Sequence, residues 1–289
     1  MRPQARYFPV SSAPLKMVAG LRRLSAEPEA ERGFFQVDEQ RPAYLAAKRR
    51  APAERHGLFG TDAAAESART HALAWMHETL AREHPSVLAD ARADGEARDE
   101  LDALARVLQE DFAVLSAGEH DQGRTVALDV RFPSGWRPER LAGASFAALH
   151  QPVPDFVVNT PAAQSMVRAM VERGPYVRFV WTLCTDDELD HHPDVRRVEP
   201  WETADALWLR VERQVTVPLP AAHAALFLIR TYVYPCASLD DEQRHTVGRA
   251  LACMPPEVRA YKGLPQQAQV RALLDGARAE GWKKLIRIG

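Results

Sequence analysis

The amino-acid sequence predicts an α+β protein in which an antiparallel sheet is flanked by helices at both ends of the chain. Apolar residues recur at helical spacing near the start and the end of the sequence. Between these regions, residues 176–234 alternate apolar and polar side chains, as half-buried strands do. Two of these strands are joined by a short turn and not by a helix. That order favours an antiparallel sheet over a βαβ fold.

The chain divides by composition near residue 60. Residues 1–60 are rich in proline, arginine and alanine and predict an irregular segment packed on the core. Residues 61–289 predict a single domain that ends in helices, because 289 residues suit one large domain. The sequence contains no internal repeat and no low-complexity linker.

The individual elements follow from apolar spacing and from breaks at proline and glycine. Leu73, Met76 and Leu80 form a helical stripe that ends before Pro85, and Leu101, Leu104, Leu108 and Phe112 form a second one. A capping box is predicted at 238–241. These rules predict, in order, helices over 63–84 and 97–112, a turn over 118–123, a strand over 125–132, a break at 133–136, a short helix or loop over 141–150, a helix over 161–172, a strand over 176–183, a charged exposed loop over 185–200, a hairpin over 206–234, and helices over 238–254, 256–262 and 266–279.

The hairpin carries charges inside strand-like sequence. Alternation places Arg213 on the apolar face with Val211 and Val215, and Glu212 on the opposite face. Arg230 lies in line with the apolar residues of the second strand. A guanidinium on a buried face is costly unless an anionic or strongly polar group meets it. The partner could be Glu212 in a cross-strand salt bridge, a ligand carboxylate, or bound oxygen.

Composition excludes several functional classes. Lys and Arg total 37 against 39 Asp and Glu, a formal net charge of −2, so the basic excess of a general nucleic-acid binder is missing. No apolar run approaches the length of a membrane span, and the N-terminus has no apolar signal region. Three widely spaced cysteines, Cys184, Cys236 and Cys253, fit neither a disulfide framework nor a zinc site. A reducing cytoplasm is therefore the expected location.

Three blocks of sequence resemble one known family. Residues 210–214 (RVERQ), a turn containing Leu-Pro, and residues 227–232 (FLIRTY) form the first block. FPSGW at 132–136 followed by LHQPVP at 149–154 forms the second, and residues 14–24 followed by residues 38–48 form a weaker third. In order and spacing they resemble the haem-dependent oxidative N-demethylases, which include the haem subunit of dimethylamine monooxygenase. The chain departs from the family pattern at Val180, where Asn is expected, and at His223, where Gly is expected.

The resemblance implies a PAS-like sheet that binds haem b, with His150 as the axial iron ligand. Pro152 and Pro154 follow His150 and predict an extended backbone there. From the sequence alone, a single histidine beside an apolar run is more often a hydrogen-bonded structural residue. The remaining possible ligands are His71, His77, His191, His192, His223, Cys184 and Cys236, and the pair at 191–192 is predicted to be solvated.

The resemblance also implies roles for polar residues around the haem. Arg213 or Arg230 would donate hydrogen bonds to oxygen bound in the pocket, and Glu212 would hold a secondary ammonium ion. Cofactor-binding roles are expected for Arg131 and Arg178, as partners of the haem propionates, and for Trp136, packed on the macrocycle edge. Surface salt bridges and core packing would explain these three residues equally well.

The implied activity is that of a haem-dependent monooxygenase subunit. A small N-methylated amine would be oxidised with O2 to a carbinolamine, which collapses to formaldehyde and the shorter amine. The chain has no GxGxxG motif and no cysteine cluster, so electrons would come from a separate reductase component that carries FMN and a 2Fe-2S centre. A non-catalytic PAS-like sensor of gas or redox state and a haem-free small-molecule binder are the alternatives. The sequence leaves the amine open.

Overall fold

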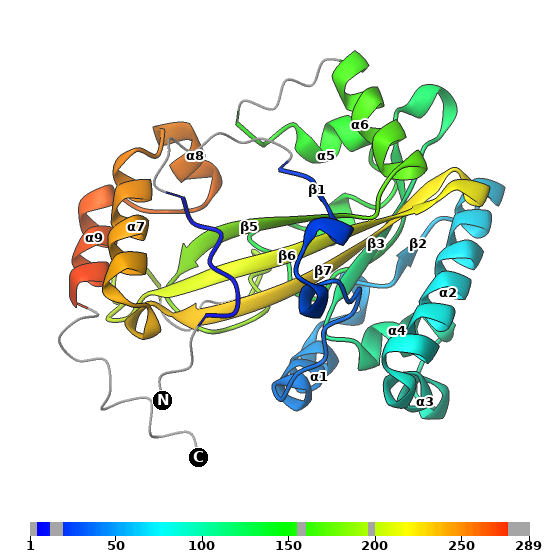
Figure 1. Ribbon diagram of the computed structural model, residues 1–289, viewed down its shortest axis with the longest axis horizontal. Helices are drawn as coiled ribbons and strands as arrows, with labels where there is room; N and C mark the ends of the chain where they lie inside the picture. Colours follow the sequence, from blue (N-terminus) through cyan, green and yellow to red (C-terminus); the bar gives the residue numbers. More distant parts are fainter. Residues whose placement is uncertain (1–4, 12–19, 155–159, 196–199, 277–289) are drawn as a thin grey trace.

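The computed structural model describes residues 5–11, 20–154, 160–195 and 200–276, and in them it confirms an α+β fold (Figure 1). One seven-stranded sheet has the order β1-β5-β6-β7-β3-β4-β2, and each pair of neighbouring strands is antiparallel. The strands are β1 (Arg22–Arg23), β2 (Leu58–Phe59), β3 (Asp111–Ser116), β4 (Arg124–Asp129), β5 (Tyr176–Cys184), β6 (Trp208–Leu219) and β7 (Ala224–Pro235).

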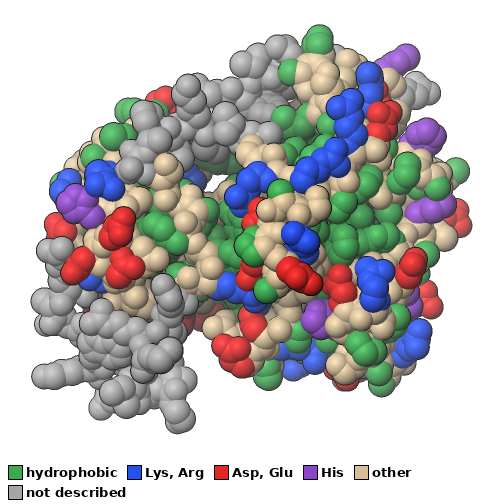
Figure 2. All heavy atoms as spheres, viewed as in Figure 1, with side chains coloured by type: hydrophobic (Ala, Val, Ile, Leu, Met, Phe, Trp, Pro, Cys, Tyr) green, Lys and Arg blue, Asp and Glu red, His purple; other side chains and the backbone are tan. Residues whose placement is uncertain are grey.

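Helices lie before, within and after the run of strands. None of those in the described ranges is long and apolar enough to cross a membrane. Acidic and basic side chains are interspersed over the face of the molecule in Figure 2. The α-helices are α1 (Arg41–Arg50), α2 (Ala63–Glu83), α3 (Pro85–Ala93), α4 (Glu100–Val107), α5 (Phe146–His150), α6 (Thr160–Glu172), α7 (Asp241–Ala252), α8 (Pro256–Tyr261) and α9 (Gln267–Gly276).

The largest error of the sequence prediction concerns residues 97–112. The predicted single helix ends at Val107 as α4, and Asp111 begins β3. Phe112 and Val114 are fully buried because β3 pairs with β7 on one side and β4 on the other. A short apolar run fits either a helix or a buried strand, and here the long-range strand pairing decided.

Other predictions were wrong over shorter segments. The segment 1–60, predicted to be irregular, contains α1 and two short strands. The helix predicted over 63–84 is confirmed as α2, and Pro85 then begins a further helix, α3, since the first helical turn tolerates proline. The capping box of α7 is formed by Asp240 and Gln243, two residues later than predicted. His150 is the last residue of a helix and is not extended.

The two faces of the sheet are covered differently. One face, called the closed face below, carries apolar residues that pack against α2, α3 and α4 at one end and against α7 and α9 at the other. Residues 31–38, called the N-terminal segment below, lie across the middle of this face (Figure 1). The opposite face, called the open face, is covered at one end by α5 and α6. The alternation of β6 therefore places apolar residues on the closed face and polar residues, Glu212 and Gln214 among them, on the open face.

Two arginines on the closed face hold the N-terminal segment. Arg213 and Arg230 are directly paired across β6 and β7, and both are almost fully buried. Arg213 donates to the carbonyls of Glu31 at 3.0 Å and Gly33 at 2.7 Å, and Arg230 donates to the Asp38 carboxylate at 2.8 Å. These bonds offset the cost of burying the two guanidinium groups.

Replacing Arg213 by Met should lower the free energy of unfolding by about 2–4 kcal/mol, because buried backbone carbonyls lose their donor. Urea denaturation measures this loss. Arg23→Met is the matched control on an exposed side chain, and a change within about 0.5 kcal/mol is expected there. Equal denaturation midpoints for Arg213→Met and wild type would show that the guanidinium does not anchor the segment.

Candidate functional site

In the middle of the open face, several side chains of neighbouring strands are partly exposed. β5, β6 and β7 lie side by side in the sheet, where side chains are usually covered. Alternation and register place one set of their side chains on the open face. We call this set the floor; it consists of Arg178, Val180, Thr182, Glu212, Gln214, Phe227, Ile229 and Val233, all of them partly exposed.

His150 stands at one border of the floor. It ends α5, which packs with α6 on Leu115, Ala225 and Phe227 of the sheet. Its Nδ1 lies 2.8 Å from the carbonyl oxygen of Phe146. A carbonyl can only accept, so Nδ1 carries the proton and the unprotonated nitrogen is Nε2, the usual form of a metal-binding imidazole.

Electrostatics also keeps this imidazole neutral. Burial lowers the pKa of His150, and the charge of Arg178 lowers it further, although the bond to Phe146 acts in the opposite direction. Neutral imidazole is the form that binds iron. The shift also shows that Arg178 lies within electrostatic range of His150, so the structure brings these two sequence-predicted residues to the same site.

A chain of hydrogen bonds crosses the floor from one charge to another. Arg178 Nε donates to Gln214 Oε1 at 2.6 Å, and Gln214 Nε2 donates to Glu212 Oε2 at 2.9 Å. We call these three residues the polar string. Arg210 follows on the same strand face, with its Nε 3.9 Å from Glu212. Arg210 also donates to the carbonyls of Phe132 and Leu189, which ties two loops to this end of the open face.

The far border of the floor comes from the C-terminal part of the chain. Lys262 follows α8, and its Nζ donates to the carbonyl of Trp181, while its own carbonyl accepts from Thr182 Oγ1 at 3.3 Å. Burial lowers the pKa of Lys262 to about 8, and attraction to Glu212 acts against this change. Tyr261 is 45% exposed beside it, an unusual value for a large side chain. Sequence patterns gave no signal for these two residues, because only the tertiary fold brings α8 to β5.

Several sequence-predicted residues lie elsewhere. Arg213 and Arg230, expected in the pocket, are on the closed face, because the β6 ladder runs without a bulge and neighbouring residues must point to opposite sides. Arg131, expected to bind a propionate, is buried in an ion cluster, 2.8 Å from both Asp129 and Asp102. These corrections leave Glu212 and Arg178 at the floor.

The loop after β4 contains Trp136, which is partly exposed and is not one of the floor residues. Its neighbour Gly135 donates to the carbonyl of His191. The prediction that His191 and His192 are solvated was wrong. Both are buried, with His191 Nε2 3.2 Å from Asp186 and His192 Nε2 3.1 Å from Glu139. The contact of His192 with Glu139 joins the two loops, and that of His191 with Asp186 lies within one of them.

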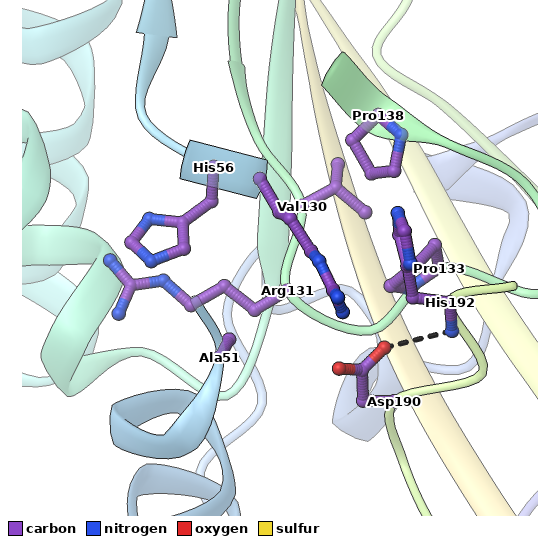
Figure 3. A pocket seen from close by; sticks show the side chains of 9 residues that line it. Ala51, His56, Val130, Arg131, Pro133, Pro138, Asp190 and His192 are labelled. Atoms are coloured by element: carbon purple, nitrogen blue, oxygen red, sulfur yellow. Dashed lines mark hydrogen bonds between the residues drawn. The ribbon is translucent and has the colours of Figure 1, made fainter. Parts of the chain in front are cut away.

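A small pocket lies beside these loops. Figure 3 shows His56 and Arg131 on one side of it and His192 and Asp190 on the other. It is far too small for a macrocycle, and the described floor residues do not line it. Two other predicted ligands are not among the floor residues. His71 is exposed on α2, which packs on the closed face, and Cys236 is buried.

The two departures from the family pattern have different surroundings. Val180 lies on the floor, paired with Glu212 across β5 and β6. Its methyl groups make the surroundings of this carboxylate less polar than an amide would. His223 lies in the hairpin turn with φ of 45°, a left-handed conformation that glycine adopts most easily.

The floor and its borders suit a haem group chemically. Val180, Phe227 and Ile229 offer apolar side chains to a flat ring, and His150 offers a nitrogen ligand in the required tautomer. Arg178 offers a cation to a carboxylate.

Lys262 makes stability depend on pH. Its pKa is about 8 in the folded protein and 10.5 in an ordinary environment, so the unfolded chain binds more protons between these values. The wild type therefore gains stability as pH rises through this range. The stability of Lys262→Met relative to wild type should fall by on the order of 1–3 kcal/mol from pH 7 to pH 10, measured by urea denaturation. A difference that stays constant with pH would contradict the assignment.

The chain matches a known family over most of its length. Residues 27–271 match the family model described as haem-dependent oxidative N-demethylase, alpha subunit-like. The match includes all the floor residues and His150. It indicates an oxidoreductase of the haem-dependent oxidative N-demethylase type, and the term alpha subunit indicates an enzyme with further components. The chain belongs to the haem-dependent oxidative N-demethylase alpha subunit-like family.

Proposed function

We propose that this chain is the haem-carrying subunit of an amine-oxidising monooxygenase, with His150 as the axial ligand of haem b at the floor. The observation that carries the proposal is the tautomer of His150, held by the Phe146 carbonyl at the border of a partly exposed sheet face. An antiparallel sheet with one open face and helices beside it also supports a PAS-like arrangement. The family match supports the haem and the reaction class.

Haem supplies the oxygen and redox chemistry, and the protein supplies ligation, polarity and shape. The apolar floor residues Val180, Phe227 and Ile229 exclude water from a bound ring and from an N-methyl group. Oxidation of that group with O2 gives a carbinolamine, which collapses to formaldehyde and the shorter amine. We propose that a reductase component with FMN and a 2Fe-2S centre provides the electrons, and that the assembly works in the cytoplasm.

Glu212 is the carboxylate of the floor and is the proposed anchor of a cationic amine. Gln214 Nε2 donates to its Oε2 at 2.9 Å, which fixes the orientation of the carboxyl group. The second oxygen, Oε1, lies 3.9 Å from Arg210 Nε, beyond hydrogen-bond distance. A substrate ammonium therefore meets a side chain that is already oriented, in a less polar surrounding than water.

Replacing His150 by Ala should abolish or greatly reduce haem retention while the protein stays folded. Wild-type protein produced with a haem supply should show a Soret band and roughly one haem per chain. His71→Ala, an exposed histidine on α2, is the matched control and should keep wild-type haem content. Full haem content and an unchanged spectrum in His150→Ala would contradict the ligand assignment.

Replacing Glu212 by Gln keeps the shape of the side chain and removes its charge. The apparent Kd of a cationic amine should rise about 10- to 100-fold, because a charge-assisted bond contributes roughly 1.5–3 kcal/mol. Perturbation of the Soret band on titration from pH 6 to 9 measures this. Haem content and carbon monoxide binding should not change. Glu242→Gln on the exposed side of α7 is the control. Equal amine affinity in Glu212→Gln and wild type would assign Glu212 to structure alone.

A further inference from the structure

Arg178 is the cation of the floor, and only one of its guanidinium nitrogens, Nε, has a hydrogen-bond partner among the described residues. Its Nε is bound by Gln214, but no hydrogen bond or ion pair joins its Nη atoms to another described residue. The buried sheet arginines Arg210, Arg213 and Arg230 all direct their Nη atoms to carbonyl or carboxylate oxygens. A partly buried guanidinium with unused donors requires an oxygen acceptor, and its planar fork fits a carboxylate best.

Burial changes the pKa of the Arg178 guanidinium. It lowers the pKa of Arg178, and attraction to Glu212 and Tyr261 only opposes that change. The guanidinium is thus partly desolvated without a carboxylate in contact. An anionic ligand group would remove this cost when it binds.

Gln214 prevents Arg178 and Glu212 from neutralising each other directly. Its amide oxygen must face Arg178, because a guanidinium can only donate, and its amide nitrogen therefore faces Glu212. The polar string thus presents a positive end and a negative end as separate binding groups. A simple alkylammonium ion would satisfy only the negative end.

The spacing of the two ends suits one small molecule. Arg178 pairs with Gln214 across the strands, and Glu212 is two residues further on the same face, so Arg178 and Glu212 are diagonal neighbours. Such neighbours lie about 7–8 Å apart and long side chains converge across that distance. The ammonium nitrogen and the carboxylate carbon of an α-amino acid are about 2.5 Å apart, which converging side chains can contact together.

We propose that the substrate is an N-methylated amino acid, a zwitterion whose ammonium group pairs with Glu212 and whose carboxylate pairs with Arg178. This inference rests on the proposed function, since the methylated nitrogen is the group to be oxidised. A haem propionate has the same carboxylate chemistry as the substrate end. The experiment below therefore separates these two sources.

The test compares three ligands of nearly the same shape. N,N-dimethylglycine carries both charges, N,N-dimethylisobutylamine carries the ammonium alone, and 3-methylbutanoate carries the carboxylate alone. Binding to haem-loaded wild-type protein is measured by calorimetry and by Soret perturbation. Dimethylglycine should bind at least about 10-fold more tightly than either single-charge ligand, since each charge-assisted contact adds roughly 1.5–3 kcal/mol.

Two variants assign the ends. Arg178→Gln should weaken dimethylglycine about 10- to 100-fold and leave dimethylisobutylamine unchanged, whereas Glu212→Gln should weaken both. Arg23→Gln is the matched control, because Arg23 is exposed on β1 beside β5. Haem content is measured for each protein.

Three outcomes would overturn the inference. The first is equal wild-type affinity for dimethylglycine and dimethylisobutylamine. The second is an equal loss for both ligands in Arg178→Gln. The third is loss of haem in Arg178→Gln, which would assign this arginine to a propionate. Failure of the proposed function is a separate result: wild-type protein would retain no haem, and calorimetry would still report whether the zwitterion binds.

Discussion

The regular alternation of the β6–β7 ladder is the constraint on which the rest of the structure depends. Glu212 and Arg213 are neighbours in the chain, and a strand without a bulge must place them on opposite faces of the sheet. One face is then free to be filled by the N-terminal segment and apolar helices. The other keeps a carboxylate, an amide and a guanidinium where a ligand can reach them. A shift of one residue in register would exchange the two faces completely.

The closed face supports the strands that carry the open face. Arg213 and Arg230 are buried cations, and each is stable there because carbonyl or carboxylate oxygens of residues 31–38 meet it. The same bonds hold residues 31–38 on the sheet, where Phe35 also packs in the core. Support from packed side chains behind the floor suits a site that must orient small groups.

The charges of the open face are arranged for binding and not for mutual neutralisation. Gln214 separates Arg178 from Glu212 and sets the direction of both hydrogen bonds. Lys262 donates a hydrogen bond to the backbone carbonyl of Trp181 on β5, and Glu212 attracts its charge. Because the effective dielectric constant at a partly buried site is lower than in water, these charges interact strongly with one another and with any bound group. The imidazole of His150 stays neutral in the same setting.

The sequence by itself determined the fold class, the hairpin, the opposite facing of Glu212 and Arg213, and, through its resemblance, the family. These are local properties: side-chain period, turn residues and motif order can be read without knowing what packs against what. The sequence did not determine that residues 111–116 form a central strand or that His150 ends a helix, because short apolar or proline-flanked segments fit several local structures. It also did not determine that residues 31–38 would cover Arg213 or that Lys262 would reach Trp181. Contacts between segments so far apart in the chain depend on the packing of the whole domain, and only the tertiary structure decided them.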